Sequence, residues 1–525
     1  MKRVRSSKIV LVTFLAVASL FTNSVLAQTL SWEVFWGSSG FEVASAIVSD
    51  TLVVSPDTSG NLYVTGTKQP GPSGGYDAFI ASFDRFGVLR WETYWGTRMA
   101  YDTASTLAID VCGNIYIAGV TSPGPFGLYD VFVASFNSSG GLRWEAFWGT
   151  SEYEWASAVA VDTSGNIYVT GRTSHVYYPG PWDAFLVSFN SSGGFRWEAF
   201  WGTPNGYDRA DAVAVDSLGN VYIGGRTGQG EVYGQPFEAF LVSYDSFGDL
   251  RWETLWGKIA CDYVYGIAFD LLGNIYITGV TYVFGPFGGD DAFLVSFNSS
   301  GGFRWEAFWG TPDREAAYGV ALDPLGNAYI SGYASPGPFG GEDAFIASFD
   351  RFGVLRWETY WGGQGNDRAS GIALGLGNVY IAGHTNPGPL GGYDVFIAAF
   401  ALPPINATVD IDPNTLNLAS NGQWITCYIE LPEDYDINDI DIKTIRLNDN
   451  VLVDLSAPSE IGDHNKNGIL DLMVKFDRSS ILAQQHTADY TVDTGKSYED
   501  AFKVWGIIEG MSFEGFDAVR ILGKG

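Results

Sequence analysis

Acidic side chains recur at two fixed places in this 525-residue chain, each time in the same local context. The first set lies six or seven positions after a tryptophan that precedes a glycine, and consists of Glu42, Asp102, Glu154, Asp208, Asp262, Glu315 and Asp367. The second set opens a short apolar segment, and consists of Asp77, Asp130, Asp183, Glu238, Asp291, Asp343 and Asp394. Carboxylates gathered on one surface bind cations or polar ligands, and two at a suitable separation are what a glycosidase needs.

Both sets also have a purely structural interpretation. A carboxylate beside a turn accepts backbone N–H groups and so holds one loop against its neighbour. A residue that every copy of a repeat carries is usually part of the scaffold. We expect both sets to lie on one face of the molecule as loop-holding groups, with ligand binding by that acidic face as the alternative.

A third constellation lies near the C-terminus, where residues 463–471 follow the calcium-loop pattern D-x-N-x-N-G-x-x-D. Oxygen-bearing side chains at alternate positions converge on one hard cation, while Gly468 permits the sharp turn. The expected ligands are the side chains of Asp463, Asn465, Asn467 and Asp471 and the carbonyl of Ile469. Val474 stands where a helix-loop-helix hand would carry its bidentate glutamate. We therefore predict one Ca²⁺ in a loop of a β-domain; an Asx-rich turn without metal is the alternative.

The elements that must position the two acid sets are repeats. The phrase Trp-Glu-x-x-Trp-Gly begins at positions 32, 91, 144, 197, 252, 305 and 357, in steps of 52 to 59 residues. Gly-Asn-x-Tyr recurs with it, and residues 183–204 and 291–312 are identical. This period is typical of a propeller or a solenoid. We expect the repeated tryptophans to pack between neighbouring copies; stacking on carbohydrate is the alternative.

One copy contains four short apolar segments rich in β-forming residues, at 156–162, 166–173, 183–190 and 194–202, separated by turn residues. Four strands per copy indicate a propeller blade, whereas a β-helix has shorter repeats. The chain opens with a lone outer strand at 31–37, and its last copy ends at 394–400 without one. The sequence therefore predicts an all-β protein: a seven-bladed β-propeller with four-stranded blades, in which the N-terminal strand closes the last blade.

These phrases resemble a known family. GNIYVTGRT (165–173), DAFLVSFN (183–190) and the aromatic outer strand are similar to the SBBP repeat of bacterial and archaeal proteins, which is named for seven-bladed β-propellers. The resemblance covers about residues 30–401 and recurs in every copy. It implies an exported or surface propeller and no single activity.

The two ends of the chain differ from the repeats. Residues 1–27 combine a basic start, an uncharged stretch and a small-residue ending, which predicts a signal peptide, with an uncleaved anchor as the alternative. The predicted propeller occupies 28–401, and 402–525 is predicted to be a small β-sandwich. With FEGFDAVRIL at 513–522, this C-terminal part resembles the calcium-loop β-domains of secreted bacterial and archaeal proteins.

Charge and composition limit the function. The net charge is −30, which argues against nucleic acid as a partner because phosphate binding needs clustered Lys and Arg. Four histidines leave little material for a His-based centre. We expect no transmembrane segment after signal cleavage. The sequence favours a secreted or cell-surface binding or scaffold module, with a glycan or protein ligand and a calcium-stabilised accessory domain; a secreted polysaccharide-active enzyme is the alternative.

Overall fold

The computed structural model describes residues 11–13, 28–50, 60–174, 181–204, 206–228, 237–257, 261–282, 285–375, 377–417, 420, 422–432, 435–448, 450–485, 497–508 and 511–522. The chain divides into two compact units, Met1–Gly375 with Val379–Ala401, and Leu376–Asn378 with Leu402–Gly525. The expected leader lies outside the described residues except for β1 (Leu11–Thr13), which pairs with β2 (Leu30–Trp36). Within the described part, no helix is long and apolar enough to cross a membrane.

The described part of the first unit forms seven sheets, each built on four neighbouring strands. The first strands are β3 (Phe41–Ser49), β7 (Tyr101–Ile109), β11 (Tyr153–Val161), β15 (Arg209–Val215), β19 (Cys261–Phe269), β23 (Arg314–Leu322) and β27 (Asn366–Gly375). The second strands are β4 (Leu62–Gln69), β8 (Ile115–Ser122), β12 (Ile167–Ser174), β16 (Val221–Thr227), β20 (Ile275–Tyr282), β24 (Ala328–Ser335) and β28 (Asn378–Asn386). The third strands are β5 (Asp77–Phe83), β9 (Asp130–Phe136), β13 (Trp182–Phe189), β17 (Glu238–Tyr244), β21 (Asp291–Phe297), β25 (Asp343–Phe349) and β29 (Asp394–Ala401).

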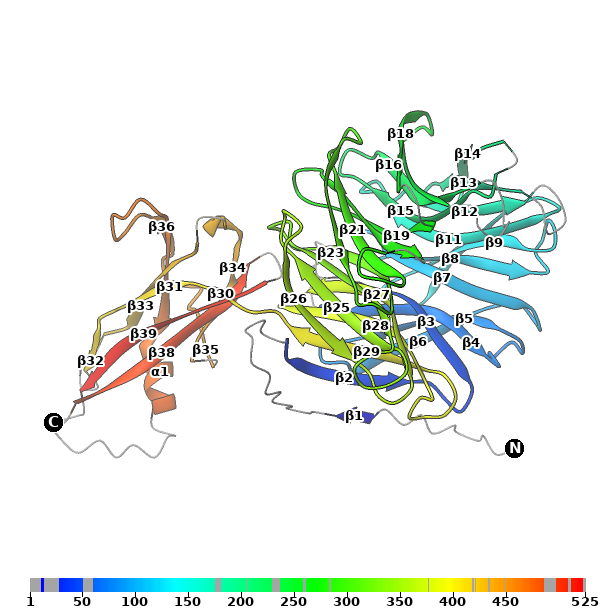
Figure 1. Cartoon of the computed structure of the whole chain (residues 1–525). Helices are drawn as coiled ribbons and strands as arrows, with labels where there is room; N and C mark the ends of the chain where they lie inside the picture. Colours follow the sequence, from blue (N-terminus) through cyan, green and yellow to red (C-terminus); the bar gives the residue numbers. More distant parts are fainter. Residues whose placement is uncertain are drawn as a thin grey trace, which may run out of the picture. The chain divides into compact units, whose positions relative to one another are not determined.

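Six fourth strands follow their third strands along the chain: β6 (Leu89–Trp95), β10 (Leu142–Trp148), β14 (Phe195–Trp201), β18 (Leu250–Trp256), β22 (Phe303–Trp309) and β26 (Leu355–Trp361). The last sheet has β2 as its fourth strand, paired antiparallel with β29, which is the pairing that the order of the repeats predicts. In Figure 1 the blue strand β2 accordingly lies beside the yellow β29.

The Gly-Asn-x-Tyr phrase follows the turn between the first and second strands. In the second copy, Asp110 accepts the backbone N–H and the side-chain amide of Asn114 and the hydroxyl of the buried Tyr116. Arg143 on the fourth strand donates to Ser135 on the third. Equivalent Asp–Asn–Tyr contacts form around Asp50, Asp162, Asp216, Asp270 and Asp323. The repeated polar residues therefore satisfy buried hydrogen-bonding groups inside six of the seven sheets.

The two tryptophans of each Trp-Glu-x-x-Trp-Gly phrase connect neighbouring sheets. In five phrases the first donates from Nε1 to a carbonyl in the next sheet, as Trp144 does to Ser191 at 3.0 Å. The second donates to the glutamate of the next phrase, in the pairs Trp36–Glu92, Trp95–Glu145, Trp148–Glu198, Trp201–Glu253, Trp256–Glu306, Trp309–Glu358 and Trp361–Glu33. The last of these bonds returns to β2, so the links form a closed circuit. The first strands contact one another in the same cyclic order, β27 against β3 included.

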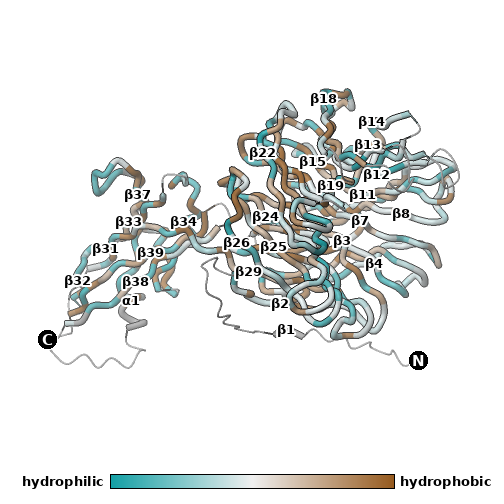
Figure 2. The backbone as a smooth tube through the Cα atoms, viewed as in Figure 1, coloured by the Kyte–Doolittle hydropathy of each residue, from teal (hydrophilic) through white to brown (hydrophobic). Residues whose placement is uncertain are grey.

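The second unit contains two sheets in its described part. One comprises β30 (Ile405–Asn406), β32 (Thr415–Asn417), β34 (Ile440–Leu447), β35 (Val451–Leu452), β38 (Ser497–Ile508) and β39 (Met511–Leu522). The other comprises β31 (Thr408–Asp412), β33 (Trp424–Glu430), β36 (Glu460–Gly462) and β37 (Asp471–Asp477). One hydrophobic cluster draws residues from both, among them Ile429, Phe476, Phe502 and Phe513. Figure 2 shows hydrophobic residues concentrated along strands, with hydrophilic residues gathered in loops.

A short helix, α1 (Arg478–Gln485), and one 3₁₀ turn, η2 (Ile437–Asp439), also belong to the second unit. The sequence did not predict them. The reason is their length, because eight and three residues are too few to display a helical period.

Candidate functional site

The seven acids of the first set are buried, with exposed fractions of 3% or less. Several hold the loop that precedes their own strand. Glu315 accepts the backbone N–H of Thr311 at 2.9 Å and its hydroxyl at 2.6 Å, and Glu154 makes the same two contacts with Thr150. Asp367 accepts the N–H of Gly363 at 2.7 Å. These carboxylates are turned into the protein, which favours the structural interpretation over an exposed acidic face.

The second set is buried at Asp77, Asp130, Asp291, Asp343 and Asp394, and partly buried at Asp183 and Glu238. Its members hold the loop between the second and third strands. Asp343 accepts the N–H of Phe339 at 2.6 Å, and Asp291 that of Phe287 at 2.7 Å. The two acid sets therefore secure different loops and point inward rather than toward solvent.

The structure brings the two sets together in pairs. An acid at the start of a third strand meets the acid of the next sheet's first strand beside the glycine that follows the second tryptophan. At Gly310, a Cβ atom would lie closer than 3.0 Å to both Asp291 and Glu315. Gly149 stands in the same way between Asp130 and Glu154. Burial raises the pKa of Asp291, Glu315 and Asp130, since the charged form loses its water.

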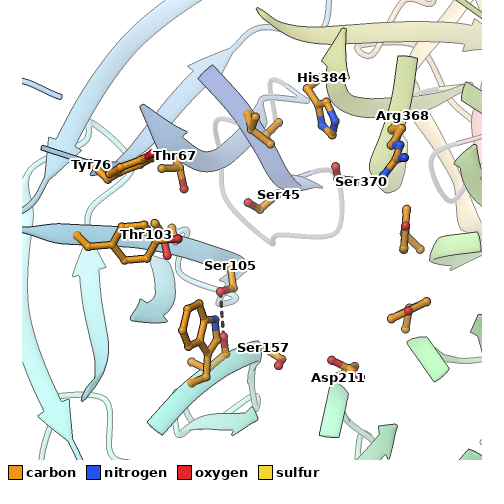
Figure 3. Close-up of a pocket in the computed structure, with 18 of the residues that line it drawn as sticks. Ser45, Thr67, Tyr76, Thr103, Ser105, Ser157, Asp211, Arg368, Ser370 and His384 are labelled. Carbon is orange, nitrogen blue, oxygen red and sulfur yellow. Dashed lines mark hydrogen bonds between the residues drawn. The ribbon is translucent and has the colours of Figure 1, made fainter. Parts of the chain in front are cut away.

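A cavity of about 660 Å³ lies among the first strands of the seven sheets, and every first strand contributes to it. This volume is within the ordinary range for small-ligand sites. Its lining includes Ser45, Thr103, Trp155, Asp211, Tyr265, Tyr318, Arg368 and His384. Figure 3 shows the labelled side chains of this lining arranged around an open centre.

Aromatic rings and charged groups line different parts of the cavity. Trp155 stacks on Tyr129 with ring centroids 5.3 Å apart, and Tyr265 meets Tyr318 at 5.1 Å. Asp211 forms an ion pair with Arg209. Arg368 pairs with Glu342 and lies over the ring of Tyr333 at 4.5 Å. The wall thus combines aromatic rings with charged groups held in ion pairs, although the chain as a whole is strongly acidic.

Some polar atoms of the lining are buried without a hydrogen-bond partner among the described residues, including Ser157 Oγ and His384 Nδ1. Burial and the nearby Arg368 lower the pKa of His384 to about 4, so the ring is neutral at pH 7 and offers one donor and one acceptor. Buried polar groups of this kind usually have a partner, which can be a ligand or an ordered water.

Sequence reasoning missed these cavity residues. Many stand one and three residues after the acid of the first set, which we count as position two of the first strand. These are positions three and five of that strand. A β-bulge lies at the fifth position in six sheets, at Ser45, Ser105, Ser157, Asp211, Tyr265 and Tyr318. A bulge redirects a side chain, which simple alternation does not predict. The sequence signal that could have found them is variation between the copies. Copies that are otherwise similar carry Val, Thr, Trp, Arg, Tyr or Ala at the third position.

The predicted metal ligands near the C-terminus do lie close together, in the loop between β36 and β37. Asp463 accepts the N–H groups of Asn467 and Gly468 at 3.0 and 3.1 Å. The amides of Asn465 and Asn467 both donate to Glu430 on β33, at 3.0 and 2.6 Å. Glu430 is a carboxylate beside the loop that the motif did not indicate.

Two further ligand candidates complete this loop. Asp471 is buried and accepts the N–H of His464 at 2.9 Å, and Ile469 donates its N–H to Asn467. In the described part of the chain, no three His, Cys, Asp or Glu side chains are grouped so as to hold a metal ion. A cation here would therefore depend on asparagine oxygens as well as carboxylates.

The model of the β-propeller repeat, SBBP, matches residues 149–178 and 260–288. The chain carries SBBP β-propeller repeats. Both matched segments contain a complete first strand and a complete second strand, so they include the bulge and the cavity-facing positions of two SBBP copies. Four-stranded sheets accompany these repeats throughout the described first unit.

Two curated relatives match parts of the chain. An uncharacterized WD repeat-containing protein, L264, of Acanthamoeba polyphaga mimivirus is 25% identical over 207 residues, and the regulatory protein FlaEY of Caulobacter vibrioides is 23% identical over 359 residues. These matches cover 30% and 63% of this chain, and span only 14% and 34% of the relatives.

Solved structures match the fold weakly. The β-propeller domain of the trilobed protease from Pyrococcus furiosus has 9% identity and a TM-score of 0.38, over 68% of this chain and 93% of that one. The GH43_1 enzyme from Xanthomonas citri in complex with xylose has 11% identity and a TM-score of 0.27, over 47% and 89%. Neither likeness supports an inference about activity.

Proposed function

We propose that this protein is an exported or cell-surface binding module, built as a closed seven-bladed SBBP propeller with a C-terminal β-sandwich. The circuit of seven Trp–Glu hydrogen bonds and the contact of β27 with β3 support the blade count and the closure. The hydrophobic cluster shared by the two sheets of the second unit supports the sandwich. The basic, apolar and small-residue pattern of residues 1–27 supports export.

The ligand of this module is the end of a glycan, held in the cavity that lies among the first strands. The single observation that carries this proposal is the lining: polar side chains stand beside aromatic rings around one cavity, at positions where the copies diverge. A sugar presents hydroxyl groups for polar side chains such as His384 and an apolar face for Trp155. Arg368 and Asp211 supply charged hydrogen-bonding groups on the same wall.

Binding to a glycan array, followed by calorimetric titration of the best glycan, tests the proposal. Replacing Trp155 or His384 by alanine is expected to weaken binding about tenfold or more, since each loses roughly 1.4 kcal/mol or more of contact. Phe247→Ala is the matched control, because this aromatic is 77% exposed in the turn between β17 and β18. Unchanged affinity in both cavity variants, or no glycan bound at all, would contradict the proposal.

Hydrolysis receives less support from the same cavity. A glycosidase uses two carboxylates flanking one bond. The described lining holds one acidic side chain, Asp211, and it is paired with Arg209. Both acid sets are engaged with loops. Binding is therefore the function that the geometry supports best.

The accessory domain binds calcium in its 463–471 loop. Asp463, Asn465, Asn467, Asp471 and the Ile469 carbonyl would hold the cation, and Glu430 stands beside them as a further carboxylate. Gly468 has a positive φ and open space around it, which allows the loop to turn. The donor set consists of oxygen ligands, which suits Ca²⁺.

Calcium added to the full-length protein is expected to raise the free energy of unfolding of the second unit by about 2.7 kcal/mol at a concentration 100 times Kd. Magnesium should act weakly, because it demands octahedral geometry and keeps its water. Scanning calorimetry with calcium, magnesium or chelator measures this effect. Asp463→Ala should abolish it, whereas Asp436→Ala, at an exposed Asx turn of the same unit, should not. The same melting temperature in calcium and in chelator would contradict calcium binding and would show that the loop is an Asx turn without metal.

A further inference from the structure

Blade junctions bury carboxylates in pairs without a matching positive charge. At the junction of the last two sheets, a Cβ atom added at Gly362 would lie closer than 3.0 Å to a carboxylate oxygen of Asp343 and to one of Asp367. Their exposed fractions are 0% and 2%. Asp343 Oδ1 has no hydrogen-bond partner among the described residues. Unpartnered oxygens also occur in the pairs Asp130–Glu154 and Asp291–Glu315.

One junction differs from the others. Where the last sheet meets the first, Asp394 and Glu42 form the pair, and Lys68 makes an ion pair with Glu42 through Oε1. Glu42 Oε2 and Asp394 Oδ1 have no hydrogen-bond partner among the described residues, so Lys68 adds a positive charge beside the pair rather than a hydrogen bond between its members. Lys68 lies directly opposite Glu42 in the β3–β4 ladder. The same register places Thr121, Thr173, Thr281 and Ala334 opposite the acids of four other copies. The chain thus supplies an ammonium group at one junction and neutral side chains at its equivalents.

The neighbours of the lysine-free pairs favour a proton over a metal ion as the missing charge. Asp343 and Asp367 accept N–H groups from Phe339 and Gly363, and N–H donors are not metal ligands. Calcium takes six to eight oxygen ligands, far more than two carboxylates provide. Two buried carboxylates that approach the same glycine cannot both ionise cheaply, and one proton held between them relieves the repulsion. We propose that the pairs Asp130–Glu154, Asp291–Glu315 and Asp343–Asp367 each retain one proton shared by the two carboxylates, and that Lys68 supplies the compensating positive charge where the last sheet meets the first.

The surroundings of Asp343 determine how this proton depends on pH. Charged and titratable groups in this region include Tyr360, which lies near Asp343, Glu358 and Glu315, and the Glu342–Arg368 ion pair. Burial, with Asp367 adding repulsion, raises the pKa of Asp343 from 3.8 to about 6. The folded state therefore holds this proton more tightly than the unfolded state. Its stabilisation is complete below the unfolded pKa and is lost as pH rises through about 6.

Asp343→Asn in the full chain tests the proposal. An asparagine Oδ1 can accept the Phe339 N–H, while its amide donates to Asp367 and so replaces the shared proton at every pH. The variant is expected to melt several degrees above the parent at about pH 8 and equally at about pH 4.5. Asp350→Asn is the control, because this carboxylate holds an outer turn by accepting the N–H groups of Phe352 and Val354.

Lys68→Thr provides the converse measurement. Removing the ammonium from the Glu42–Asp394 pair should lower the melting temperature at about pH 8, and mild acid should restore it as a proton takes the vacant role. Two results would overturn the proposal. One is Asp343→Asn destabilising equally at both pH values. The other is a bound metal ion in the parent protein that disappears in Asp343→Asn, which would make a metal the counter-charge.

Discussion

Deleting residues 30–36 is expected to reduce the stability of the first unit by more than about 5 kcal/mol, enough to unfold or aggregate most of it. The deletion removes β2, whose Trp32, Val34 and Trp36 are 6%, 1% and 4% exposed. Burying each such side chain is worth about 1.5–3 kcal/mol. The deletion also leaves β29 as an unpaired edge of the last sheet, and an unpaired sheet edge can pair with other chains.

Thermal unfolding and light scattering of the deletion variant measure this loss. A milder pair of substitutions keeps the test interpretable if the deletion does not fold. Trp361→Phe removes the hydrogen bond to Glu33, and Trp148→Phe removes the equivalent bond to Glu198 within the chain. If the N-terminal strand closes the ring as a genuine blade strand, both should cost a similar 1–3 kcal/mol. An unchanged melting curve for the deletion would refute the closure, as would an effect confined to Trp148→Phe.

Gly310→Ala should strongly destabilise a blade junction, costing about 3 kcal/mol. The new Cβ would lie closer than 3.0 Å to Asp291 and Glu315. Neither carboxylate can retreat freely, because Asp291 is held by the N–H of Phe287 and Glu315 by Thr311. The backbone itself is not strained, since Gly310 does not adopt a left-handed φ. The loss therefore reports crowding of the carboxylate pair.

Gly363→Ala is the matched control for this substitution. Gly363 follows the equivalent glycine of another copy, and nothing lies within 4 Å of its added Cβ. Its φ is also ordinary, so alanine should be neutral or stabilise by about 0.4–1 kcal/mol through the unfolded state. Denaturant unfolding of the two variants at equal pH compares them directly. Equal stabilities would show that the junction carboxylates move aside easily.

The sequence alone determined the strand-by-strand organisation of the first unit. Alternating apolar segments, turn residues and a repeated period are local properties, so they predict β2 as the partner of β29 without knowledge of any contact. The ring of Trp148 packs against Phe185 of the next sheet with centroids 4.5 Å apart, which agrees with the packing role expected for the tryptophans. The period also located both acid sets. It could not say whether Asp291 or Glu315 faces water, because position in a repeat does not encode depth.

Only the tertiary structure decided what the acids and the cavity do. Asp343 and Asp367 stand 24 positions apart in the sequence, and they meet because neighbouring sheets pack beside one glycine. Trp155 and Arg368 come from copies far apart along the chain, yet both line one cavity, because the first strands contact one another in a cycle. Bulges then redirect side chains such as Ser157 and Asp211 toward that cavity. A local pattern predicts strands, but convergence of distant side chains depends on how seven sheets pack together.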